Sequence, residues 1–123
     1  MDFKKLLAYQ KSFDLAMLIY NVSKSFPKEE KYSLTDQIRR SSRSVSANIA
    51  EAYRKRRYPR HFISKLTDSD GENSETNVWL DYAFACKYLK EEIYNSLSQE
   101  NREIGRLINY MINNPGKFGV DVE

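Results

Sequence analysis

The chain has 123 residues, of which 30% are charged and only seven are glycine (4) or proline (3), so turns are few and the elements between them are long. Such a composition excludes a β-sandwich or a small barrel, which need many turns, and no stretch approaches the roughly 18 uninterrupted apolar residues of a membrane span. The first residues show no signal-peptide pattern. We therefore expect one domain in the cytoplasm, with the single cysteine, Cys86, reduced and buried.

The first predicted helix covers residues 3–25 and stops before Pro27, a residue that often follows a helix end. Its large apolar residues recur every three or four positions and lie on one helix face. They are Leu6, Tyr9, Phe13, Met17 and Tyr20.

The second predicted helix covers residues 34–57. Ser33 is a good N-cap residue, and Asp36 follows it in a pattern that resembles a capping box. Many of its residues are serine or alanine, which lets neighbouring helices approach closely. Its core face is predicted to hold Leu34, Ile38, Val45, Ile49 and Ala52.

The third helix is predicted over residues 59–90, with a local irregularity at Gly71, and the fourth over 97–113. Short links between long helices favour antiparallel neighbours. The sequence therefore predicts an all-α, up-down-up-down four-helix bundle over residues 1–113, with a short tail over 114–123. The apolar stripe of the fourth helix is Leu97, Ile104, Leu107, Ile108, Met111 and Ile112.

Positive charge is concentrated in the middle of the chain. Eight basic residues and one acid, Glu51, give residues 39–60 a charge of +7, so the rest of the chain carries −4 of the total of +3. Clustered Lys and Arg neutralise phosphates, and the flanking Tyr53 and Tyr58 suit base stacking. The alternative is a solvated helix end whose cations complement the helix dipole. The candidate nucleic-acid-binding residues are Arg54, Lys55, Arg56, Arg57 and Arg60.

An acidic stretch runs through the third helix. If the second and third helices pack around a turn near residue 58, Arg40 and Arg43 come within reach of the acids on the third helix. We expect Arg40 or Arg43 to pair with Glu72 or Glu75 in a polar layer, and not a metal site, because no Glu-x-x-His motif is present.

The sequence offers no catalytic cluster. His61 and Cys86 lie on one predicted helix and are separated by roughly 37 Å at 1.5 Å per residue, so His61 is interpreted as a surface residue at a helix start. No enzyme activity and no cofactor are expected. Two runs apolar on more than one face, within 15–20 and 78–89, predict instead a subunit interface between copies of the chain.

Several segments together resemble a known family. They are Phe26-Pro27-Lys28-Glu29-Glu30, Gln37-Ile38-Arg39-Arg40, Ser46-Ala47-Asn48-Ile49-Ala50-Glu51, Glu75-Thr76 and Trp79-Leu80. The combination is similar to the four-helix bundle proteins also called 23S rRNA intervening-sequence proteins, over roughly residues 3 to 112. The chain departs from the family pattern at Ala52, where glycine is usual.

The resemblance implies a four-helix bundle that assembles as a homopentamer and has no known catalytic residues. Some members are encoded inside insertions in bacterial large-subunit rRNA genes. A related accessory protein of diversity-generating retroelements has a basic surface and works with nucleic acid and a reverse transcriptase. We therefore expect a non-enzymatic homo-oligomer that binds RNA or DNA non-specifically or adapts a nucleic-acid-processing partner. The alternative is a protein-interaction scaffold whose basic end meets an acidic protein.

Overall fold

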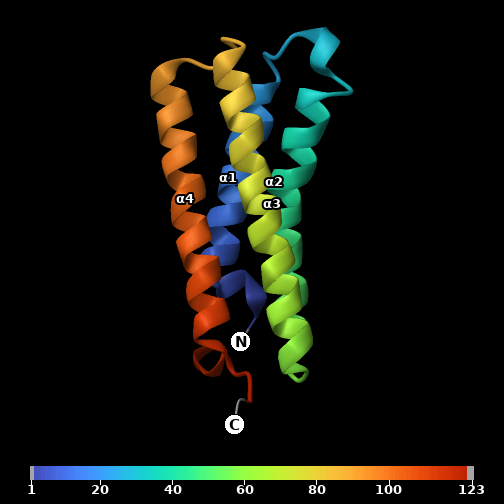
Figure 1. Cartoon of the computed structure of the whole chain (residues 1–123), viewed down its shortest axis with the longest axis vertical. Coiled ribbons are helices and arrows are strands. Elements are labelled where there is room, and N and C mark those ends of the chain that lie inside the picture. Colours follow the sequence, from blue (N-terminus) through green and yellow to red (C-terminus); the bar gives the residue numbers. More distant parts are fainter. Residues whose placement is uncertain (1, 122–123) are drawn as a thin grey trace.

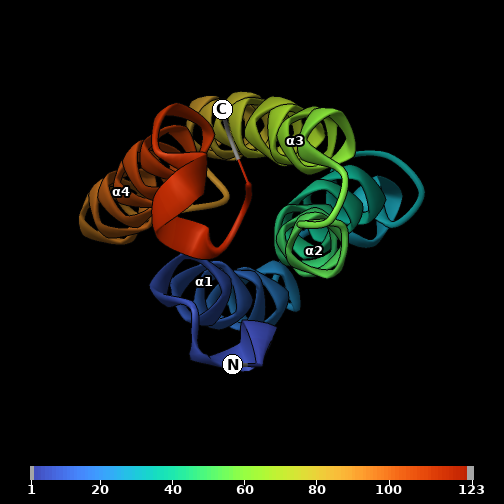
Figure 2. The same cartoon turned by 90° about the horizontal axis from the view of Figure 1, so that it is seen from below.

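The computed structural model describes residues 2–121, and these contain helices and no strands. The long helices are α1 (Leu7–Ser23), α2 (Leu34–Arg54), α3 (Pro59–Ala85) and α4 (Glu91–Asn113), with short 3-10 helices η1 (Phe3–Lys5), η2 (Lys28–Glu30) and η3 (Pro115–Phe118). Consecutive long helices run in opposite directions, and α1 lies diagonally across from α3 (Figure 1 and Figure 2). The predicted antiparallel up-down-up-down bundle is confirmed.

The end of α3 differs from the sequence prediction. The helix continues through Gly71 without interruption but ends at Ala85, and α4 begins at Glu91 rather than near residue 97. Lys87 adopts a left-handed φ of 65°. Its N–H donates to the carbonyl of Phe84, and the next N–H donates to that of Ala83, both at 2.9 Å. This is a Schellman-type end, usually marked by glycine, and a lysine there gives no signal in the sequence.

The start of α2 is capped by a residue other than the predicted one. Ser33 makes no capping bond with its side chain and has φ −124° and ψ −101°, outside the extended conformation of most capping residues. Instead, Glu30 Oε1 accepts hydrogen bonds from Ser33 Oγ at 2.6 Å and from the backbone N–H of Leu34 at 3.3 Å. Glu30, in η2, therefore supplies the cap.

The core confirms the prediction for α2 and corrects the interpretation of α1. All five predicted core residues of α2 are buried. In α1, however, Phe13 and Met17 are 48% and 46% exposed. Small side chains let α1 approach its neighbours closely, so the face with the largest residues is turned outward. The buried residues of α1 are Ala8, Ser12, Leu15, Ala16, Ile19 and Ser23.

Residues 114–121 of the predicted tail pack against the lower end of the bundle. Phe118 contacts the core, and Val120 is only 4% exposed. The chain crosses beneath the helix ends after η3 (Figure 2). The last two tail positions, 122 and 123, lie outside the described residues, as does residue 1.

Candidate functional site

The predicted nucleic-acid-binding residues lie at the turn between α2 and α3. Because α2 ends at Arg54 and α3 begins at Pro59, residues 55–58 carry their cations around the outside of a tight connection. Three of the predicted side chains are exposed here, those of Arg54, Arg57 and Arg60, and that of Lys55 is half-buried.

Arg56 differs from its neighbours because its side chain is held by the protein. Its guanidinium lies 3.7 Å from the Tyr53 ring centroid. Nε donates to the Tyr53 carbonyl at 2.8 Å, and Nη1 donates to the Phe118 carbonyl at 3.4 Å. Gly119, with φ +83°, leaves room for it, since a Cβ there would lie 2.9 Å from Nη1. Arg56 therefore fastens the C-terminal segment to the end of α2.

The beginning of the chain adds a cation to this end. A cleft of about 520 Å³ is lined by Asp2, Phe3, Lys4, Tyr53, Arg54 and Arg56. Asp2 accepts a bond from the backbone N–H of Lys4 at 3.2 Å and so caps η1. The fold thus brings Lys4 to the same cleft as Arg54, fifty positions later in the sequence, together with the carboxylate of Asp2.

Glu51, the one acid among residues 39–60, forms an ion pair with a lysine outside this cluster. Its Oε2 lies 2.9 Å from Lys65 Nζ on α3. The contact raises the pKa of Lys65, first through the hydrogen bond and then through the charge of Glu51. Glu51 is therefore neutralised by an ammonium group on the neighbouring helix.

The expected pairing of Arg40 or Arg43 with Glu72 or Glu75 is not among the ion pairs within residues 2–121. Arg40 binds Asp36 one turn away at 3.2 Å, with 74% of its side chain exposed. Arg43 lies over the Tyr20 ring at 5.5 Å. Both arginines lie to the side of the line along which α2 meets α3, so the polar layer is built from other residues.

The register between α2 and α3 is nevertheless close to the predicted one. Ser41 and Thr76 hydroxyls are hydrogen-bonded at 2.8 Å, and Ser69 Oγ donates to the Val45 carbonyl at 2.8 Å. All three hydroxyl-bearing residues are at most 2% exposed. Short hydroxyl side chains fit at this close contact, where an arginine and a glutamate would not.

A second buried polar contact, between α3 and α4, was missed. Asn73 Nδ2 donates to the Asn101 carbonyl at 3.0 Å, and Asn101 Nδ2 donates to the Asn73 carbonyl at 2.9 Å. Both residues are nearly buried, at 6% and 2% exposure. The signal was available: Asn101 stands between Leu97 and Ile104 in the apolar stripe of the fourth helix.

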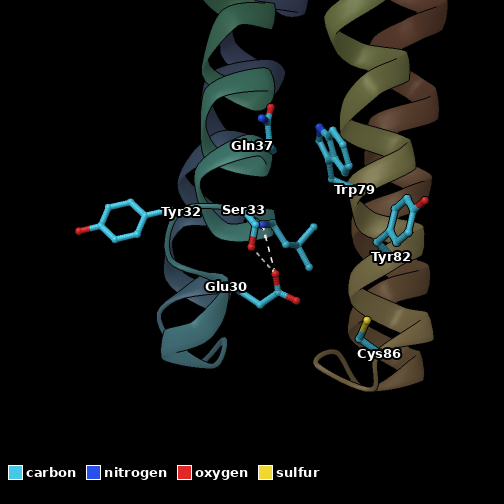
Figure 3. Close-up of a pocket in the computed structure, with 8 residues that line it drawn as sticks. Glu30, Tyr32, Ser33, Gln37, Trp79, Tyr82 and Cys86 are labelled. Carbon is cyan, nitrogen blue, oxygen red and sulfur yellow. Dashed lines mark hydrogen bonds between the residues drawn. The ribbon is translucent and has the colours of Figure 1, made fainter.

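The opposite end of the bundle contains a cleft of about 390 Å³ between the start of α2 and the end of α3. Trp79 and Tyr82 of α3 line it, and Trp79 lies across from Gln37 of α2 (Figure 3). Cys86 also lines this cleft and is exposed, which corrects the expectation of a buried thiol. Because α3 ends at Ala85, Cys86 lies on the helix terminus and outside the core.

Glu30 also links η2 to the connection between α3 and α4, through its second carboxylate oxygen. Oε2 accepts a hydrogen bond from the Tyr88 hydroxyl at 2.9 Å. Hydrogen bonds from Ser33 and then from Tyr88 lower the pKa of Glu30. The same contact, followed by burial, raises the pKa of Tyr88 to about 12. The group that caps α2 thus also fixes the connection after α3.

Among residues 2–121, no group of three or more His, Cys, Asp or Glu side chains is arranged to hold a metal ion. His61 is exposed in the first turn of α3, as predicted, with its ring 5.7 Å from that of Tyr58. None of the described helices combines the length and apolarity needed to cross a membrane.

Comparison with known proteins identifies the family. The profile described as 23S rRNA-intervening sequence protein matches residues 4–110. The chain belongs to this family. The family prediction made from the sequence is therefore confirmed, and the match covers α1, α2 and α3 completely and α4 as far as Tyr110.

A solved relative supports the same assignment. It is a crystal structure of a protein with unknown function from the S23 ribosomal protein family of Bacteroides thetaiotaomicron VPI-5482. It is 32% identical, has a TM-score of 0.79, and the match covers 87% of this chain and 96% of that chain. No curated protein sequence matches the chain. Neither the family description nor that of the solved relative names a reaction.

Proposed function

We propose that this member of the 23S rRNA-intervening sequence family is a non-enzymatic, self-associating helical bundle of the cytoplasm that binds RNA or DNA without sequence preference. The observation that carries the proposal is the basic end: Arg54, Arg57 and Arg60 are exposed and form no ion pair within residues 2–121. Lys4 lines the same cleft as Arg54, together with Asp2, and Glu51 is already neutralised by Lys65.

Phosphate contacts explain why sequence preference should be absent. Lys and Arg bound to phosphates release counterions and carry no base information, so affinity falls steeply with salt. For a single strand, the slope of log K against log salt is about −0.7 for each phosphate neutralised. Exposed arginines at a helix connection reach such phosphates without disturbing the core.

The test is fluorescence anisotropy with labelled single-stranded RNA and DNA between about 50 and 200 mM salt. The variant Arg54→Ala/Arg57→Ala/Arg60→Ala should make the salt slope shallower by roughly 2 per protomer engaged. Arg56 is left in place because it holds the C-terminal segment.

The matched control removes three exposed lysines at the opposite end, Lys28, Lys31 and Lys90. It changes the net charge equally and should leave the slope unchanged. Circular dichroism checks that both variants keep their helices. If the wild-type chain binds neither RNA nor DNA at low salt, the nucleic-acid proposal is wrong, and the alternative, a scaffold whose basic end meets an acidic protein, is favoured.

Self-association is supported by large apolar side chains exposed on two diagonally opposed helices. Met17 and Leu18 on α1 are 46% and 50% exposed, and Val78 and Tyr82 on α3 are 46% and 56% exposed. Contiguous exposed apolar surface usually marks an interaction site. Following the family resemblance, we propose a pentamer. Light scattering at micromolar concentration tests this, and a single species of 14.5 kDa would contradict it.

A further inference from the structure

Three cations converge on one aromatic ring at the groove between α1 and α2. Lys24 Nζ lies 4.9 Å from the Tyr20 ring centroid, and the guanidinium carbons of Arg39 and Arg43 lie at 4.8 and 5.5 Å. Within residues 2–121, none of the three is in an ion pair. Like charges gathered this closely repel one another, so this cation cluster (Lys24, Arg39 and Arg43) has a strong preference for an anionic partner.

A stripe of acidic side chains, opposite in charge to the cation cluster, runs along α3. Asp68, Glu72 and Glu75 are spaced four and three positions apart, which places them on one helix face. None of them is in an ion pair within the described part of the chain. Burial raises the pKa of Glu72, and the charges of Glu75 and Asp68 raise it further. Asp68 has Lys65 nearby, because its charge contributes to the raised pKa of that lysine. Glu72 and Glu75 therefore are the members of the stripe that lack a cation within the described residues.

The two surfaces overlap in height along the bundle. The hydrogen bond between Ser41 and Thr76 sets α2 level with α3, and the Tyr20 ring lies beside the same part of α2. Arg43 is thus level with the turn of α3 that carries Glu72 and Glu75. The surfaces face different directions, since the cation cluster lies on the α1 side of α2, and α3 lies diagonally across from α1 (Figure 2).

We propose that the cation cluster of one copy binds the acidic stripe of a second copy standing beside it. The ion pairing that the sequence predicted within one chain is then made between chains. This inference rests on the proposed self-association and names the surfaces that carry it.

Two features favour a second copy as the occupant. Exposed apolar side chains accompany both charged surfaces: Met17 is one turn from Tyr20, and Val78 and Tyr82 follow Glu75. The contact is also heterologous, and surfaces that overlap in height let neighbours stand side by side. A heterologous contact forms a closed ring when the rotation between neighbours closes, and an open filament when it does not.

Charge reversal tests the inference. Lys24→Glu/Arg43→Glu reverses the cation cluster, and Glu72→Arg/Glu75→Arg reverses the stripe. Arg39 is kept because its Nε donates to Ser23 Oγ at 2.8 Å, and Ser23 is 2% exposed. Each variant alone should associate more than about tenfold more weakly than the wild type in sedimentation velocity. An equimolar mixture of the two, and one chain carrying all four changes, should each regain association.

The matched control is Arg54→Glu/Arg57→Glu at the basic end, which reverses two exposed arginines outside both surfaces. It should assemble as the wild type does. If either reversal variant folds poorly by circular dichroism, Arg43→Gln and Glu75→Gln replace it. A wild-type chain that stays at 14.5 kDa overturns the proposed self-association itself. A wild type that assembles alongside unaffected reversal variants, or a mixture that does not recover, overturns only the pairing proposed here.

Discussion

Replacing Gly105 with alanine should destabilise the protein, although the same change usually stabilises a helix. In a helix interior, alanine is better than glycine by about 1 kcal/mol. Gly105 lies within α4, but a Cβ there would stand 3.0 Å from Asn73 Nδ2. That nitrogen is not free to move, because it donates to the Asn101 carbonyl in the buried contact between α3 and α4.

The magnitude follows from these opposing effects. Displacing the Asn73 amide leaves a buried donor unpaired, which costs about 1–3 kcal/mol. After subtraction of the helix gain, the expected loss in the free energy of unfolding is about 1 kcal/mol. Gly71→Ala in α3 is the matched control, since nothing lies within 4 Å of its Cβ position, and it should gain up to about 1 kcal/mol.

Urea unfolding at one fixed protein concentration measures both changes, with unaltered m-values as the sign of an unchanged unfolded state. In an Asn73→Ala background the obstruction is gone, so Gly105→Ala should become stabilising there. If Gly105→Ala and Gly71→Ala raise stability equally in the wild-type background, the Asn73–Asn101 contact does not constrain α4 and the reasoning is wrong.

Arg56→Ala should lower the unfolding free energy by about 1–2 kcal/mol through loss of its part-buried contacts with Tyr53 and Phe118, while Arg57→Ala should change it by less than about 0.5 kcal/mol in the same urea assay. The contact between Glu30 and Tyr88 is complete between the ordinary pKa values of 4.5 and 10.0. It should be lost as pH falls through the lowered pKa of Glu30 or rises through the pKa of about 12 at Tyr88. Melting temperatures measured across pH should therefore vary less at both extremes for Tyr88→Phe than for the wild type. An unchanged profile would show that this contact does not contribute to the pH dependence of stability. Cys86 should react with a thiol reagent in the native protein, because its side chain is exposed. A reaction that occurs only after unfolding would show that the thiol is buried.

Sequence patterns predicted the bundle because they record local preferences. Apolar residues at helical spacing, few turn residues and short connections are sufficient to specify long antiparallel helices. The same reasoning placed the basic cluster at the connection between the second and third helices, although α2 ends at Arg54 and not at residue 57, and Lys55 and Arg56 are half-buried. It did not find the end of α3, where Lys87 takes a conformation that glycine usually marks.

The tertiary structure decided which polar groups meet. Arg43 has a predicted glutamate partner on α3, yet it lies over Tyr20 instead, and the α2–α3 contact is filled by Ser41 and Thr76. Asn73 and Asn101 are hydrogen-bonded although 28 positions separate them in the sequence. Such pairs depend on the rotation of each helix about its axis, which periodicity constrains only to within a broad face.

The rotation of α1 about its own axis was also decided by packing. By itself, the sequence marks Phe13 and Met17 as the apolar face, but close packing of the four helices favours the smaller Ala8, Ser12 and Ala16 at the contact. The sequence by itself thus determined that four helices form, in what order, and where the basic end lies. Only the packing of those helices decided which faces are buried, because interhelical distance selects side chains by size as well as by hydrophobicity.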